Sequence, residues 1–122
     1  MFDLESEEAR ELLNVALMAT GQNRFRSAEK ILAALERFRP EEASVAVANA
    51  ILRISTLDFR SALEYIDNDA LPRFPQSAML KAFKGMTLIR MNRKEEAMIP
   101  LGEAASDSSD PAAAQLAKDL MI

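Results

Sequence analysis

The chain has 122 residues, which is enough for one domain with a hydrophobic core. Apolar residues make up 49% and charged residues 28%, and the formal net charge of −4 disfavours binding to the phosphates of nucleic acid. Cysteine and histidine are both absent, which excludes disulfides, cysteine-bound zinc, and Ser-His-Asp or Cys-His catalysis.

Apolar residues at helical spacing predict two helices in the first third of the chain. Residues 1–5 are expected to be frayed, and Ser6-Glu7-Glu8 supplies a cap and an acidic first turn. The first helix is expected to end at Gly21. The second is expected over about 24–38, because the residue before Pro40 is pushed out of the helical region.

The next two helices are predicted to differ in length. Pro40-Glu41-Glu42 is expected to open the third helix, with proline in the first turn and two carboxylates at the positive end of the helix. This helix is apolar on several sides, which favours a central position between neighbours. The fourth helix is expected to begin at Phe59 and to be short, since Asp67-Asn68-Asp69, Pro72 and Pro75 break its pattern.

Three more helices are predicted in the last third. The fifth is expected over about 76–91 and the sixth over about 94–105, where Pro100 should kink or shorten it. Asp110-Pro111 provides a cap and a first-turn proline for a last helix that ends near Met121. The prediction is seven helices, in three pairs plus one capping helix.

One four-residue phrase occurs twice. Phe25-Arg26-Ser27-Ala28 returns as Phe59-Arg60-Ser61-Ala62, an offset of 34 residues. This is the period of the tetratricopeptide repeat, a helix–turn–helix unit that stacks into a solenoid. Ala97 follows Ala62 by 35 residues, and we assign the inserted residue to the loop from Pro72 to Pro75.

The predicted fold is therefore all-α. It is a tetratricopeptide-like right-handed solenoid of three helix pairs plus a C-terminal capping helix, built as one domain over residues 1–122. The repeats are expected at about 9–42, 43–75 and 76–109, and the capping helix at 110–121.

No catalytic constellation is apparent in the sequence. The pairs Glu7-Glu8, Glu41-Glu42 and Glu95-Glu96 are each expected in the first turn of a helix, where solvated acids stabilise the helix dipole by roughly 0.3–1 kcal/mol. Asp67-Asn68-Asp69 lacks the glycine and the distal glutamate of a calcium loop. We expect no enzyme activity, no cofactor and no metal; the remaining enzymatic alternative is a metal held by carboxylates.

The first helices of such repeats line the concave side of the solenoid, at their second, fifth, ninth and twelfth positions. With repeats starting at Ala9, Ala43 and Ala78, three of these twelve positions are polar: Arg10, Thr20 and Ser44. The other nine are apolar and form the predicted groove: Leu13, Leu17, Val47, Ile51, Ile54, Met79, Ala82, Met86 and Ile89.

An open groove this apolar is expected to be filled by a partner. Met79 and Met86 suit an adaptable contact, so the expected guest is an amphipathic helix laid in the groove. The alternative is that these residues are ordinary core.

Three segments look like the turns of tetratricopeptide repeats: Asn23 to Glu29, Leu57 to Leu63 and Asn92 to Ala97. The resemblance covers about residues 9–105. One branch of that family binds the C-terminal carboxylate of heat-shock chaperones through Lys and Asn side chains. The matching positions here are Leu13, Leu17, Ala48, Met79 and Phe83, which cannot hold a carboxylate.

A narrower resemblance rests on three repeats, a truncated second pair, a proline-broken link from Asn68 to Pro75 and a Ser-Asp-Pro start of the last helix. With these features the chain resembles the small tetratricopeptide co-chaperones of bacterial type III secretion, although its link lacks the tryptophan of part of that family. The resemblance implies a virulence-related chaperone whose concave face cradles the amphipathic C-terminal helix of the needle subunit. It also implies a second small chaperone in the complex, and prevention of premature polymerisation in the bacterial cytoplasm.

A second hypothesis stays open: a scaffold or homo-oligomer module in another pathway, in which the apolar face meets its own copy in a homodimer. No apolar run is long enough to cross a bilayer, and no basic segment followed by an apolar one opens the chain. We therefore expect a cytoplasmic protein with no membrane partner.

Overall fold

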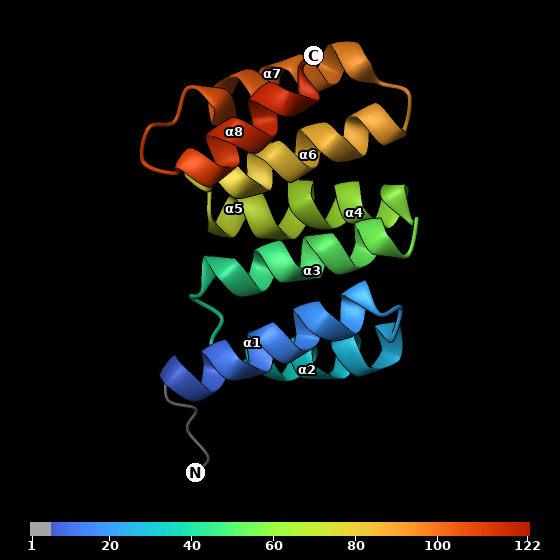
Figure 1. Ribbon diagram of the computed structural model, residues 1–122, viewed down its shortest axis with the longest axis vertical. Helices are drawn as coiled ribbons and strands as arrows, with labels where there is room; N and C mark the ends of the chain where they lie inside the picture. Colours follow the sequence, from blue (N-terminus) through green and yellow to red (C-terminus); the bar gives the residue numbers. More distant parts are fainter. Residues whose placement is uncertain (1–5) are drawn as a thin grey trace. The chain divides into compact units, whose positions relative to one another are not determined.

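The computed structural model describes residues 6–122, so the expectation for residues 1–5 lies outside the described part. Every regular element within 6–122 is helical, which confirms the all-α prediction (Figure 1). The chain divides into two compact units, unit 1 up to Leu57 and unit 2 from Asp58 onward. This boundary falls inside the second predicted repeat, between its two helices.

Unit 1 contains three helices: α1 (Ser6–Gly21), α2 (Phe25–Phe38) and α3 (Ala43–Ser55). Each of the three packs against the other two. Ala16, Leu32 and Leu35 are fully buried between them, and Phe25 and Ile31 pack on this core. The small alanine on α1 lets α2 approach closely, so the hairpin has a dense interior.

Unit 2 begins with a continuous helical run that comprises α4 (Phe59–Tyr65), the π-helix η1 (Ile66–Ala70) and α5 (Leu71–Arg73). It continues with α6 (Ala78–Arg90), α7 (Lys94–Ala105) and α8 (Pro111–Leu120), and α8 packs on both α6 and α7. With the run from Phe59 counted once, residues 6–122 hold seven helices, as predicted. The Asp110 side chain accepts a hydrogen bond from Ala113 N, which confirms the predicted cap of α8.

The start of the third helix was predicted wrongly. α3 begins at Ala43, and Pro40 lies before it. Glu41 and Glu42 are held by Arg39, at 3.4 Å and 2.9 Å, so they are not in the first turn of α3. The acidic pairs Glu7-Glu8 and Glu95-Glu96 do lie in the first turns of their helices.

The fourth helix is not truncated at Asp67, as the sequence had suggested. It continues to Arg73, because the π-helical segment carries the chain past the acidic residues. Ile66 and Ala70 are fully buried and anchor this segment. Asp67 pairs with Lys84 at 2.8 Å and Asp69 with Arg73 at 2.8 Å, so the carboxylates that appeared to break the helix are neutralised at its surface.

The π-helix also explains the inserted residue. The loops 39–42 and 74–77 have the same length, whereas the helix α2 spans 25–38 and the run that follows α3 spans 59–73, one residue more. A π turn closes over one residue more than an α turn, and Leu71 N–H donates to the carbonyl of Ile66, five residues back. The assignment of this residue to the Pro72–Pro75 loop was therefore wrong.

Pro100 lies inside α7, and the helix runs through it from Lys94 to Ala105. Of the two predicted effects of Pro100, a kink or a shortening, the shortening does not occur. Pro100 is buried, and its neighbour Leu101 is fully buried among α6, α7 and α8. Packing against these neighbours compensates for the hydrogen bond that proline cannot donate.

Three turns in the chain share one backbone conformation. Asn23, Leu57 and Asn92 have φ values of 62°, 64° and 61°, and they are the described non-glycine residues with positive φ. They follow α1, α3 and α6 at intervals of 34 and 35 residues. In the first and third turns the next N–H reaches five residues back, from Arg24 to Ala19 and from Arg93 to Leu88, both at 2.8 Å. This bond is the mark of a left-handed helix C-terminus that reverses the chain.

The buried positions repeat at the same intervals. Ala28, Ala62 and Ala97 are each fully buried in the first turn or two of the helix after the shared turn. Four residues later a large side chain is fully buried in each case: Leu32, Ile66 and Leu101. The 34-residue phrase in the sequence therefore corresponds to a repeated local structure.

Gly85 marks the closest approach between two helices of unit 2. A Cβ atom at this position of α6 would overlap the Leu101 side chain of α7, which is fully buried and has no room to move. We predict that Gly85→Ala lowers the free energy of unfolding by about 1–3 kcal/mol, measured by urea denaturation. The matched control is Gly102→Ala on α7, where a Cβ atom meets nothing within 4 Å; it should be neutral or stabilise by up to about 1 kcal/mol. Equal effects of the two variants would contradict this packing.

Leu57 is the residue least suited to its turn, because leucine tolerates positive φ poorly and its side chain is 66% exposed. Asparagine occupies the equivalent position in the other two turns. Leu57→Asn should therefore raise the free energy of unfolding by about 1 kcal/mol. The reverse change, Asn92→Leu, should lower the free energy of unfolding by a similar amount. Both can be measured by thermal denaturation, and a midpoint that is lower for Leu57→Asn than for Asn92→Leu would refute the argument.

Candidate functional site

The nine residues of the predicted groove lie on three helices. Leu13 and Leu17 are on α1, and Val47, Ile51 and Ile54 are on α3, all in unit 1. Met79, Ala82, Met86 and Ile89 are on α6 in unit 2. The residues of each unit are considered in turn.

In unit 1 the groove residues have partly exposed apolar side chains above a packed core. Leu13 and Leu17 are half-buried and pack on the core of the α1–α2–α3 cluster. Val47 and Ile51 on α3 are also half-buried, whereas Ile54 is buried in the core and contributes little to a binding surface. Since α1 and α3 are in contact, these side chains give unit 1 apolar surface on two neighbouring helices.

A hollow of about 330 Å³ opens where the N-terminal halves of α1 and α3 meet. It contains Arg10 and Leu13 from α1 and Ser44 from α3, three residues assigned to the concave side from the sequence. The structure brings these three together on one side of α1 and α3 within unit 1. The remaining lining residues are Ser6, Ala9, Arg39, Glu42 and Val45.

Arg39 is the residue of this hollow that the sequence argument missed. Its Nη2 donates to Ser6 Oγ at 3.2 Å and to Glu42 Oε1 at 2.9 Å, so it ties the start of α1 to the residue that precedes α3. The sequence feature that points to this ion pair is the spacing: Arg39 precedes Glu41 by two residues and Glu42 by three. The prediction that those carboxylates lie in the first turn of a helix left the ion pair with Arg39 out of account.

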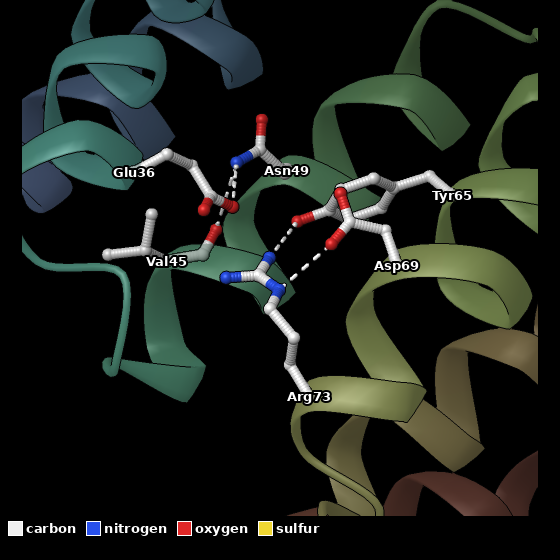
Figure 2. Close-up of polar contacts among 6 residues, drawn as sticks. All are labelled: Glu36, Val45, Asn49, Tyr65, Asp69 and Arg73. Carbon is white, nitrogen blue, oxygen red and sulfur yellow. Dashed lines mark hydrogen bonds and ion pairs between the residues drawn. The ribbon is translucent and has the colours of Figure 1, made fainter.

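A second polar contact joins α2 to α3. Asn49 Nδ2 donates to Glu36 Oε1 at 3.0 Å and to the carbonyl of Val45 at 3.4 Å (Figure 2). Figure 2 also labels a group within unit 2, where Arg73 donates to Asp69 Oδ1 at 2.8 Å and to Tyr65 Oη at 3.4 Å. Within each unit these bonds fix neighbouring helical segments.

In unit 2 three of the four predicted residues are available to a partner. Met79, Met86 and Ile89 are half-buried, and Met79 and Ile89 pack on the α6–α7–α8 core. Ala82 has no exposed surface, so it supports the helix packing and contributes nothing to a binding surface.

Ion pairs on both sides hold α6 in place. Lys81 pairs with Glu103 of α7 at 3.3 Å, and Lys84 pairs with Asp67 of η1 at 2.8 Å. Arg90 lies 4.9 Å from the centroid of the Phe59 ring and adds a contact to α4. The apolar side chains of α6 are therefore displayed on a helix that is fixed by its neighbours.

Two carboxyl groups within residues 6–122, Glu96 and Asp107, have lowered pKa values. No group of three or more Asp or Glu residues in this range is placed to hold a metal ion. Hydrogen bonds from Arg93 lower the pKa of Glu96, and hydrogen bonds from Ser109 lower the pKa of Asp107, so both carboxyls are held in the ionised form. No helix in this range combines the length and apolarity that a bilayer crossing requires.

Comparison of the chain with protein family models, with curated proteins and with solved structures gave no match.

The Arg93–Glu96 pair at the start of α7 generates a prediction about pH. The guanidinium donates to both carboxylate oxygens, at 2.6 Å and 2.8 Å, and this lowers the pKa of Glu96 from its ordinary value of 4.5. A lowered pKa in the folded state stabilises the fold above the unfolded pKa, and this contribution is lost as pH falls through the folded pKa. Arg93→Gln should raise the pKa of Glu96 towards 4.5, measured by carboxyl carbon NMR titration. An unchanged pKa would show that the pair does not persist in solution.

Proposed function

We propose that the protein is a binding protein whose apolar side chains on α1, α3 and α6 receive an amphipathic helix of a partner. One observation carries the proposal: large apolar side chains on these helices are half-buried, where ordinary core residues would be fully buried, and Leu17, Ile51 and Met86 are so at the corresponding position of all three. Leu13, Leu17 and Met79 pack on buried core residues and keep part of their apolar surface exposed. Burial of such side chains by a partner is worth roughly 1.5–3 kcal/mol each before the cost of association.

The proposal includes a tetratricopeptide-like solenoid. The three left-handed turns at intervals of 34 and 35 residues and the repeated burial of Ala28, Ala62 and Ala97 support this arrangement. In such a stack the first helix of each pair lines one side, so α1, α3 and α6 would present their apolar faces together.

For the biological role, we propose a cytoplasmic bacterial chaperone that holds a self-assembling subunit, the type III secretion needle subunit, and prevents its premature polymerisation. The support is the resemblance of the three turns and of the capped last helix to that family of co-chaperones. A scaffold or homo-oligomer module without enzyme activity is the second candidate, and the same apolar surface would serve it.

The test is capture of the partner in the native host. A tagged full-length chain should retain one small, helix-rich polypeptide, identified by mass spectrometry. Ile51→Asp places a charge on the apolar surface of α3 and should weaken this capture about a hundredfold, because about 3 kcal/mol of contact and desolvation is lost.

The matched control is Ser55→Asp, which adds the same charge at an exposed position of the same helix. It should leave capture unchanged. If Ile51→Asp captures the partner as well as the wild type does, with unchanged helical circular dichroism, the proposed binding surface is wrong.

A further inference from the structure

The side of α1 that points away from Leu13 and Leu17 also carries exposed apolar residues. Val15 is 49% exposed and Met18 is 62% exposed, and they lie three residues apart, so their side chains are neighbours. At 100° per residue their mean direction is roughly 150° from that of Leu13 and Leu17. This outer face of α1 is therefore a surface separate from the proposed groove.

Charged residues flank this apolar pair in a definite order. On the N-terminal side, Glu7, Glu8 and Glu11 are exposed. On the C-terminal side, the turn after Gly21 and the start of α2 carry Arg24 and Arg26, which are also exposed. None of these five charged residues forms an ion pair with another residue in the described range 6–122.

Along the outer face of α1, acidic residues come first, then the apolar pair, then the basic residues. When a second copy is placed antiparallel to the first, its basic end lies against the acidic end of the first copy, and the reverse. A two-fold axis between Val15 and Met18 brings the apolar residues of two copies together. Glu8 lies about 13 Å from that axis along α1, and the basic turn begins about 7 Å away on the other side, within the reach of an arginine side chain. The acids of each copy then face the arginines of the other.

We propose that the outer face of α1 is a self-association surface, on which a second copy of this chain packs antiparallel about a two-fold axis near Val15 and Met18. The alternative parallel pairing is disfavoured, since it places Glu8 and Glu11 against the same acids of the other copy. The proposal does not rest on the proposed function. A dimer formed in this way leaves Leu13, Leu17 and the other groove residues uncovered.

The first test is the mass of the full-length chain in solution, from sedimentation equilibrium over a range of concentrations. We expect a reversible dimer of twice 13.5 kDa, which weakens about tenfold between 50 mM and 500 mM salt because the charges are exposed. Val15→Ser with Met18→Ser should weaken it about tenfold or more. A wild-type chain that stays monomeric at every concentration would overturn the proposal.

The second test exchanges charges. A chain with Arg24→Glu and Arg26→Glu should be monomeric, and so should a chain with Glu8→Arg and Glu11→Arg, because like charges then meet across the axis. An equimolar mixture of the two should recover a heterodimer, since both contacts in it join opposite charges. A mixture in which both chains stay monomeric, or single variants that dimerise as the wild type does, would refute the two-fold arrangement.

The matched control is Lys94→Glu with Lys118→Glu, which makes the same change in net charge at exposed positions of unit 2, outside α1 and α2. It should leave the dimer unchanged, and loss of the dimer in this control would mean that net charge alone governs association. Ile51→Asp should also leave it unchanged. If Ile51→Asp abolishes the dimer while the α1 variants do not, the copies associate through the groove and the proposal is wrong.

Discussion

The structure depends on a chain reversal that occurs three times in one backbone form. A left-handed residue follows α1, α3 and α6 and directs the chain into the next helix. Small residues then let helices approach closely, most clearly where Gly85 leaves space for Leu101. After each reversal an alanine is fully buried near the start of the next helix, at Ala28, Ala62 and Ala97. The proposed function rests on the half-buried apolar side chains of α1, α3 and α6, the helices that precede the three reversals.

Much of the local structure follows from short-range rules that the sequence displays directly. The repeated phrase from Phe25 and Phe59, the Gly21 and Pro40 stops and the Asp110 cap are all local features, and they predicted the helix count and most helix ends. The bounds of α7 agree with the predicted range of about 94–105, because a turn with Asn92 precedes the helix and a polar segment follows it. Helix ends and turns of this kind can be predicted from sequence because each depends on a few neighbouring residues.

The failures arise where tertiary contacts override local preference. Arg39 captures Glu41 and Glu42 before α3 begins, and no propensity rule predicts that ion pair. Asp67, Asp69 and Pro72 appear to end the fourth helix, yet buried Ile66 and Ala70 and the π turn carry it on. For the candidate site, the sequence predicted one face on each of α1, α3 and α6 but could not show that Ala82 is wholly covered, because that depends on how closely α7 and α8 pack on α6.

The central claim is that a partner helix rests on the half-buried apolar side chains, while the outer face of α1 serves a different association. Methyl NMR of the full chain with the co-purified polypeptide tests it most directly. The account predicts that the methyl signals of Leu13, Leu17, Val47 and Ile51 shift on binding, and that those of the buried Leu32 and Leu35 move little. Shifts confined to Val15 and Met18, with the groove methyls unchanged, would contradict it.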